Sequence, residues 1–270
     1  MNAVGWAGRY GPAALVLGGS EGIGRQFAEE LAARGLDLLL VARGAASLES
    51  AAAELRARHA VTVTTRAHDL AGDGLEALAA ELAGSHDIGL VVCNAGATHG
   101  VGPFLDEPLA QPLGLVRLNC LAPLTFAHEL LRRRRGRGGG LIVVSSMSGL
   151  CGSGLVATYA AAKAFQITLC EGLNWELARE GLDVLCAVAG LTDTPAMRRS
   201  GLSFTAAQEK GYVPMQAAAV ARGALAQLGQ AAVWYAVGEQ AAAALRAMPR
   251  AQLIPVMSEA SAALYGVTLR

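Results

Sequence analysis

Aromatic residues and net charge are both scarce in this sequence. Aromatics make up 5% of the 270 residues and hydrophobic residues 53%, so any core must be built mainly from Ala, Leu and Val. Such a core suits helices packed on a buried sheet better than a sandwich of aromatic cross-strand pairs. The formal net charge is zero, so no long-range field attracts nucleic acid or an anionic membrane. We expect neither as a partner.

The sequence also lacks paired cysteines, a secretory signal and a long apolar run. The five cysteines are widely spaced and none forms a CxxC pair, which argues against a disulfide framework and a metal site. No Lys or Arg precedes Arg9, and Gly18 and Gly19 break the first apolar stretch, so we expect no signal peptide. No window holds 18 uninterrupted apolar residues, as a spanning helix would need. We therefore expect a cytoplasmic protein.

One basic run stands out, Arg132 to Arg135 followed by Arg137 and three glycines. Cations at the carboxyl end of a helix interact favourably with its dipole, so the run favours a solvated helix end. A nucleic-acid surface is the alternative interpretation, and salt-dependent DNA binding would support it.

Short apolar runs alternate with longer segments of helical composition. Seven runs predict fully buried strands: Ala13–Leu17, Leu36–Val41, Val61–Arg66, Ile88–Val92, Leu141–Val144, Val184–Val188 and Val233–Val237. Six segments predict helices: Ile23–Arg34, Ser47–His59, Leu75–Ala83, Leu113–Arg135, Tyr159–Glu180 and Ala217–Leu228. This alternation implies right-handed crossovers and a parallel sheet covered on both faces. Without an internal repeat or composition break, we expect one α/β domain over residues 1–270, a doubly wound Rossmann sheet of about seven strands.

The first strand-to-helix turn is rich in glycine. Gly18, Gly22 and Gly24 remove side chains where the backbone must approach a pyrophosphate and where the helix must pack close to the strand. The start of the following helix offers free N–H groups to phosphates. A glycine-rich turn in this strand–turn–helix context predicts a dinucleotide site.

The second strand ends at the position that reads the adenosine ribose in such sites. Ala42 and Arg43 follow it, and no acidic residue is present to accept hydrogen bonds from a ribose 2′-OH. Arg43 can instead pair with a 2′-phosphate, which favours NADP(H) over NAD(H). Glu21, however, leaves the glycine turn without a second basic group. An ordinary surface arginine is the alternative for Arg43.

Six short motifs in a fixed order resemble the short-chain dehydrogenase/reductase family over nearly the whole chain. They are Gly18 to Gly24, Asp69-Leu70, Asn94-Ala95-Gly96, Asn119, Ser146 and Tyr159 to Lys163, with Ser146 thirteen residues before Tyr159. Within the family the sequence is similar to NADP-dependent hydroxysteroid dehydrogenases, above all the 7β-hydroxysteroid branch, with 17β-hydroxysteroid and 3-ketoacyl reductases nearby. Two positions depart from the family pattern, Leu17 in place of Thr and Ala189-Gly190 in place of Pro-Gly. The second puts the shape of the loop beside the nicotinamide in doubt.

The resemblance implies a catalytic tetrad of Asn119, Ser146, Tyr159 and Lys163. Tyr159 and Lys163 are four residues apart on a predicted helix, so they share one face. A phenol titrates near ~10, and a neighbouring ammonium should lower that pKa, which lets Tyr159 act as general acid and base. Ser146 would donate to the developing oxyanion. Lys163 would also hold the nicotinamide ribose, and Asn119 a water that relays protons.

The same resemblance implies the cofactor contacts. These residues are Gly18, Ser20, Glu21, Gly22, Ile23, Gly24, Arg43, Asp69, Leu70, Asn94, Ala95, Gly96, Tyr159, Lys163, Gly190, Thr192 and Thr194. Asp69 is expected to contact the adenine, and Asn94 to support the end of the fourth strand.

Two apolar segments would flank the reacting carbonyl, the loop 147–158 and a lid at about 192–215. Their Met and aromatic side chains suit a steroid-like, fatty-acyl or aromatic ketone. We also expect a C-terminal extension at about 239–270 and a homodimer or homotetramer. The alternatives are a lid that packs on a neighbouring subunit, a reductase of small polar ketones or sugars, and a catalytically idle dinucleotide-binding regulator.

Overall fold

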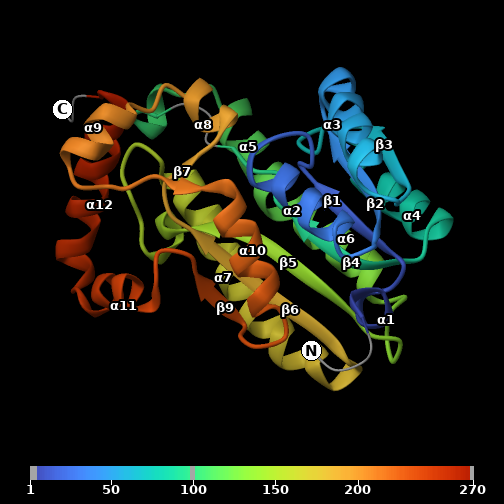
Figure 1. Cartoon of the computed structure of the whole chain (residues 1–270). Coiled ribbons are helices and arrows are strands. Elements are labelled where there is room, and N and C mark those ends of the chain that lie inside the picture. The colour runs from blue at the N-terminus through green and yellow to red at the C-terminus, as the bar shows by residue number, and fades with distance from the viewer. Residues whose placement is uncertain (1–4, 98–100, 268–270) are drawn as a thin grey trace.

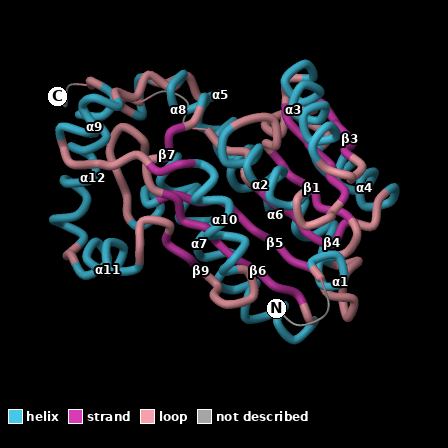
Figure 2. Tube along the Cα trace, viewed as in Figure 1, coloured by secondary structure: helices cyan, strands magenta, loops and turns pink. Residues whose placement is uncertain are grey.

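A seven-stranded parallel sheet forms the centre of the computed structural model, which describes residues 5–97 and 101–267 (Figure 2). The strand order is β3-β2-β1-β4-β5-β6-β9, with every neighbouring pair parallel. The strands are β1 (Ala13–Leu17), β2 (Asp37–Ala42), β3 (Val63–Ala67), β4 (Ile88–Cys93), β5 (Gly139–Ser146), β6 (Leu182–Ala189) and β9 (Val233–Tyr235). The predicted single-domain Rossmann fold is confirmed.

Helices cover both faces of the sheet, and alternate residues of each inner strand pack on opposite layers. Leu15 and Leu17 face the layer formed by α4 (Leu75–Ser85), α6 (Ala122–Leu131) and α7 (Ala157–Leu177). Ala14 and Val16 face the layer formed by α2 (Gly22–Ala32), α3 (Ala45–Arg58) and α10 (Ala217–Gln227). Two cores built from Leu, Val and Ala result, as the composition predicts.

The two outer strands are not fully buried, so that part of the prediction is wrong. In β3 only Val63 is buried, and in β9 only Tyr235 is. Each lies at an edge of the sheet, where one side has no neighbouring strand to exclude solvent. β3 also begins two residues later than the predicted segment.

A π-helical turn interrupts the long helix predicted over 113–135. The chain forms α5 (Ala110–Val116), then the π turn Arg117–Leu121, then α6. Pro123 has no N–H to donate to the carbonyl of Asn119, four residues earlier. That carbonyl instead accepts a hydrogen bond of 2.8 Å from Nε2 of Gln166 on α7. The proline therefore frees Asn119 for contacts across the helix layer.

The basic run after α6 is only partly a solvated helix end. Arg134 is buried, with 5% of its surface exposed, and it donates to the Gly138 carbonyl (2.9 Å) and to Asp87 (2.8 Å). Arg132 pairs with Glu129 at the end of α6, as expected for a helix terminus. The prediction of a solvated run is wrong for Arg134, because the glycines after it fold back and offer it a backbone carbonyl.

Several elements outside the sheet have no counterpart in the sequence prediction. They are α1 (Trp6–Tyr10), the short parallel pair β7 (Thr192–Asp193) and β8 (Met215–Gln216), α8 (Pro195–Arg199), α9 (Phe204–Glu209), α11 (Glu239–Ala247) and α12 (Arg250–Tyr265). Figure 1 shows α9, α11 and α12 on the side of the molecule opposite α3 and α4, with α8 between α9 and α5. The predicted extension 239–270 thus forms two helices, and its last three residues lie outside the described part of the chain. Of the described helices, none has the length and apolarity needed to cross a bilayer.

Candidate active site

The glycine-rich turn brings three strand ends within backbone contact. Gly18 has φ +82°, and its N–H donates to the Val41 carbonyl at the end of β2 (2.7 Å). A Cβ on Gly18 would lie 2.8 Å from the Ala95 nitrogen, and one on Gly24 would lie 2.0 Å from the Gly18 carbonyl oxygen. Only glycine fits either position, so α2 begins directly under the turn with its free N–H groups at the carboxyl edge of the sheet.

The segment after β4 connects this turn to the predicted tetrad. The N–H groups of Asn94 and Ala95 both donate to the Leu17 carbonyl (3.1 and 2.7 Å), and Asn94 Nδ2 donates to the Gly18 carbonyl (3.2 Å). A Cβ on Gly96 would lie 2.9 Å from Asn119 Oδ1 and 3.2 Å from Lys163 Nζ. The absence of a side chain at Gly96 therefore keeps open the space beside both groups.

Lys163 is a buried cation. Only 4% of the residue is exposed, and its Nζ donates to the Val144 carbonyl (3.0 Å) and to Gln166 Oε1 (3.1 Å). Burial lowers the pKa of Lys163 to about 8, and nearby Cys120 and Cys186 act in the opposite direction. The ammonium is thus held in place while its charge is only weakly solvated.

Tyr159 faces this lysine, but its titration differs from the sequence expectation. Lys163 Nζ lies 5.6 Å from the centre of the Tyr159 ring. Burial raises the pKa of Tyr159 to about 12, a hydrogen bond with Ser146 opposes the rise, and Tyr265 adds to it. The expected lowering by Lys163 is wrong, because desolvation of the phenolate outweighs an ammonium directed at Val144 and Gln166.

Ser146 and Asn119 complete the group. Ser146 ends β5, and its Oγ accepts from the Ser148 N–H (3.2 Å), which caps the following 3-10 turn. Asn119 is fully buried in the π turn and donates through Nδ2 to the Leu115 carbonyl (3.0 Å). Its Oδ1 is buried and has no hydrogen-bond partner among the described residues. A buried acceptor of this kind requires a donor, such as a water or a ligand hydroxyl.

The residues predicted to contact adenosine are spread along the opposite half of the edge. Arg43 is exposed directly after β2. Asp69 Oδ1 accepts from the Ala71 N–H (3.0 Å), so part of its carboxylate serves the local turn. The side chains of Leu70 and Ile23 pack against the two cores, which leaves their backbone atoms for a cofactor.

The loop after β6 reaches back over the glycine turn. Thr192 Oγ1 donates to the Gly190 carbonyl (3.0 Å), and Thr194 Oγ1 accepts from the Met197 N–H (3.2 Å) at the start of α8. A Cβ on Gly22 would lie 3.2 Å from the Thr194 side chain. Gly190 keeps the glycine of the family's Pro-Gly pair, and a Cβ there would lie 2.4 Å from Val237. Ser20 and Glu21 lie in the turn itself, and Glu21 forms an ion pair with Arg199 of α8.

A small cavity lies beside Tyr159, with a volume of about 20 Å³. It holds roughly one water, so an apolar ketone fits only if the lining side chains move. Leu155 and Val156 belong to the loop predicted to flank the substrate, whereas Phe104, Glu107 and Leu115 were not predicted. The predicted lid 192–215 contributes no lining residue to this cavity. The backbone of Leu155 adopts φ +65°, a left-handed conformation that is strained for a residue other than glycine.

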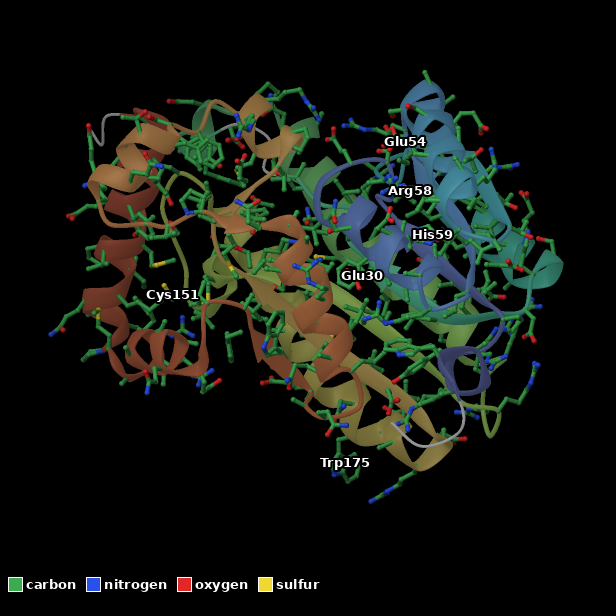
Figure 3. The ribbon with its side chains drawn as sticks, in the orientation of Figure 1. Glu30, Glu54, Arg58, His59, Cys151 and Trp175 are labelled. Atoms are coloured by element: carbon green, nitrogen blue, oxygen red, sulfur yellow. The ribbon has the colours of Figure 1, made fainter. Side chains whose placement is uncertain are left out.

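The C-terminal helix α12 also reaches the site, which sequence reasoning missed. Tyr265 is close enough to Tyr159 to raise its pKa, and its hydroxyl contacts Met197 Sδ of α8 at 3.8 Å. Ser153, from the loop before α7, donates to the Met257 carbonyl of α12 (3.2 Å). Figure 3 shows Cys151, from the same loop, on the α12 side of the molecule, far from Trp175 at the end of α7. No local motif in 250–265 signals these contacts.

Three comparisons bear on this arrangement. A family model described as short chain dehydrogenase matches residues 12–202. The chain is 34% identical over 181 residues to a very-long-chain 3-oxoacyl-CoA reductase of Laccaria bicolor, covering 65% of this chain and 53% of the relative. It is 32% identical over 215 residues to the reductase of the same name from Neurospora crassa, covering 76% and 64%. The chain thus matches about half to two thirds of the length of these curated relatives.

Solved structures with the same fold cover nearly the whole chain. A 7beta-hydroxysteroid dehydrogenase superposes with a TM-score of 0.84 at 24% identity, covering 94% of this chain and 99% of the other. At that identity the likeness concerns the fold alone. A short-chain dehydrogenase from Sphingobium yanoikuyae, in complex with NADPH, gives a TM-score of 0.77 at 29% identity and covers 86% and 90%.

The buried Lys163 ammonium generates a prediction about stability. Below pH 8 the folded protein carries the cost of a desolvated charge, which the unfolded chain does not. From about pH 8 to about 10.4 the folded lysine loses its proton first, so wild-type stability rises with pH in this window. We expect Lys163→Met to unfold with a free energy about 1–2 kcal/mol higher than wild type at pH 7, and the gap to close by about pH 10. Urea denaturation across this pH range measures it.

The exposed Lys210 supplies the control. Lys210→Met should leave the free energy of unfolding unchanged within about 0.5 kcal/mol at every pH. A gap between Lys163→Met and wild type that does not vary between pH 7 and 10 would contradict the role assigned to burial.

Proposed function

The chain belongs to the short chain dehydrogenase family, as its motifs predict, and we propose that it transfers a hydride between NADP(H) and the carbonyl or secondary alcohol of an apolar substrate. One observation carries the proposal. Tyr159, Lys163, Ser146 and Asn119 come from three elements and converge at the carboxyl edge of the sheet, next to the glycine turn. Ligands of open parallel sheets bind at this edge.

The edge of the sheet fits a dinucleotide on two grounds. Gly18 and Gly24 leave the start of α2 free of side chains, which suits a pyrophosphate that binds to backbone N–H groups. At the other end of the edge, Asn119 Oδ1 is a buried acceptor in need of a donor, and Lys163 Nζ lies near it across Gly96. A ribose hydroxyl or an ordered water would supply that donor.

Tyr159 is suited to give a proton rather than to take one. With a pKa of about 12 it is protonated throughout the neutral range, so it can donate to a carbonyl oxygen during reduction. Ser146 lies close enough to Tyr159 to oppose the rise of its pKa, and its hydroxyl can hold the same oxygen. The nicotinamide, when bound, supplies or accepts the hydride. In the oxidation direction Tyr159 must first lose its proton, so alcohol oxidation should favour alkaline pH.

Lys163 and Asn119 would return a proton to Tyr159. The Lys163 ammonium lies beside the Tyr159 ring and titrates at a pKa of about 8, within reach of neutral pH. A water held at Asn119 Oδ1 would link the lysine to bulk solvent, as the family resemblance implies. The buried carbonyls that hold Lys163 fix the geometry of this relay.

Replacing the proton donor tests the chemistry. Tyr159→Phe keeps the ring and removes the hydroxyl, so turnover of a ketone should fall by about 10²–10⁴. The Kd for NADPH should stay within about threefold, because the phenol makes few contacts compared with the whole dinucleotide. Stopped-flow oxidation of NADPH and a separate binding titration measure the two quantities. Near-normal turnover of Tyr159→Phe would mean that another group donates the proton.

Cofactor preference for NADP(H) rests on the end of β2. Arg43 is exposed there, next to the glycine turn through the hydrogen bond between Gly18 and Val41. An arginine recognises a phosphate by charge and geometry, whereas a ribose hydroxyl pair needs an acceptor that this strand end lacks. The NADPH complex of the Sphingobium yanoikuyae relative supports the same choice.

Reversing the charge at Arg43 tests this preference. We expect wild type to bind NADPH more tightly than NADH, and Arg43→Asp to reduce that ratio about ten- to a hundredfold, since a charge-assisted contact contributes ~1.5–3 kcal/mol. Arg179→Asp, in the 3-10 turn that follows α7, is the control and should leave the ratio unchanged. Equal affinity of wild type for the two cofactors would contradict the proposal.

The substrate is proposed to be a bulky apolar ketone. The cavity beside Tyr159 is lined mostly by apolar side chains, including Phe104, Leu115, Leu155 and Val156. The curated relatives are named as 3-oxoacyl-CoA reductases, which fits a long apolar chain next to the carbonyl. Phe104 is 54% exposed, so it can move aside and then cover a ligand.

Truncating Phe104, the aromatic side chain proposed to cover the substrate, should affect KM for large ketones more than KM for small ones. Phe104→Ala should raise KM for a bulky aromatic ketone about tenfold and leave a four-carbon ketone nearly unaffected, because the lost apolar contact area grows with substrate size. Phe204→Ala, the same truncation in the predicted lid 192–215, is the comparison. An effect from Phe204 alone would assign the cover to that lid, and an effect from neither would contradict a bulky apolar substrate.

We further propose that the protein is a homodimer or homotetramer in the reducing cytoplasm. Apolar side chains are exposed along the helix pair α5–α6 and on α7, namely Leu109, Leu113, Val116, Leu121, Leu124, Phe165 and Trp175. Exposed apolar side chains in such number favour contact with another protein surface. All five cysteines are free thiols and four of them are buried. The fold therefore uses no disulfide bond, which is typical of a protein in a reducing compartment.

A further inference from the structure

Glu21 places a negative charge where the proposed cofactor carries its phosphates. It is the residue directly before α2, with extended backbone, and its carboxylate caps no N–H of the helix. The start of a helix attracts anions, so a bare carboxylate here would compete with a pyrophosphate and repel it. The glycine turn itself contains no basic residue to offset this charge.

Arg199 supplies the missing charge from a distant part of the chain. It lies at the end of α8, 178 residues after Glu21, and its Nη2 forms an ion pair with Glu21 Oε1. The ion pair raises the pKa of Arg199, so the guanidinium is charged at all relevant pH values. In the described part of the chain Glu21 forms no other ion pair within 4.0 Å.

The position of α8 makes this pairing specific. Thr194 caps α8 through the Met197 N–H and packs where a Cβ on Gly22 would lie, 3.2 Å away. The neighbouring Arg198 is engaged elsewhere, with Asp193 (2.7 and 2.6 Å). Adjacent arginines of one helix therefore serve two different carboxylates, and only Arg199 serves the glycine turn.

We propose that Arg199 is a specificity-determining residue for the cofactor, which acts by neutralising Glu21 so that the glycine turn accepts a phosphate-rich dinucleotide. The inference rests on the proposed function, since it presumes that a dinucleotide binds at this turn. Surface ion pairs contribute little to stability, so the effect of Arg199 should appear in cofactor affinity rather than in folding. NADPH carries one phosphate more than NADH and should depend on Arg199 more strongly.

A double-mutant cycle on the full chain tests the proposal. The proteins are wild type, Arg199→Gln, Glu21→Gln, the double variant, and Arg198→Gln as the matched control. Isothermal titration at low ionic strength gives the Kd for NADPH and NADH, and thermal unfolding checks that each variant folds. We expect Arg199→Gln to weaken NADPH about three- to tenfold and NADH less, because an unpaired Glu21 then repels the phosphates.

The remaining variants test whether the unpaired Glu21 causes the loss of NADPH affinity in Arg199→Gln. Glu21→Gln alone should bind NADPH at least as well as wild type, and the double variant should return to within about twofold of wild type. Arg198→Gln should change neither Kd. The weakening in Arg199→Gln should also shrink on adding about 0.5 M salt, since screening reduces the repulsion.

Different failures have different meanings. A double variant as weak as Arg199→Gln would overturn the proposal, because Arg199 would then act through a contact other than Glu21. Equal weakening of NADPH and NADH, or an unchanged Kd in Arg199→Gln, would also overturn it while leaving the proposed function intact. Wild type that binds neither dinucleotide would contradict the proposed function itself, and the inference with it.

Discussion

Three backbone N–H groups hold the carboxyl ends of β1, β2 and β4 together. Gly18 donates to the last part of β2, and Asn94 and Ala95 both donate to Leu17 at the end of β1. These bonds exist only because the backbones meet without intervening side chains, which the close contacts at Gly18 and Gly24 require. The start of α2 and the segment after β4 are positioned from this junction, and Gly96 of that segment borders the Lys163 ammonium.

The inner part of the molecule could be predicted because its signals are local. Buried parallel strands such as β1 and β4 are continuous apolar runs, and Tyr159 and Lys163 share a helix face by spacing alone. The edge position of β3 and β9 depends on strand order, which the local sequence does not reveal. In β3 the polar residues Thr64, Thr65 and Arg66 also argue against a fully buried strand, and the prediction overlooked them. The direction of the shift in the Tyr159 pKa was likewise predicted wrongly, because the shift depends on burial by segments distant in the sequence.

The outer part of the site could not be predicted, since it consists of contacts between distant segments. Arg199 and Glu21, Tyr265 and Tyr159, and Ser153 and α12 each join residues more than 100 positions apart. Arg199, Tyr265 and Ser153 belong to no periodic pattern and to no family motif. Short helices such as α8 and α9 add little periodicity of their own, so their positions follow from packing onto the sheet and the glycine turn.

The position of Asn119 depends on the number of residues in its helix as well as on their identity, because Asn119 lies in the π turn Arg117–Leu121. A π turn contains one residue more than an α-helical turn. Deleting a residue here would restore regular α geometry and rotate one side of the helix by about 100° relative to the other. Asn119 would then lose either its Leu115 contact or its contact with Gln166. The number of residues between α5 and Pro123 is therefore fixed by the contacts of Asn119.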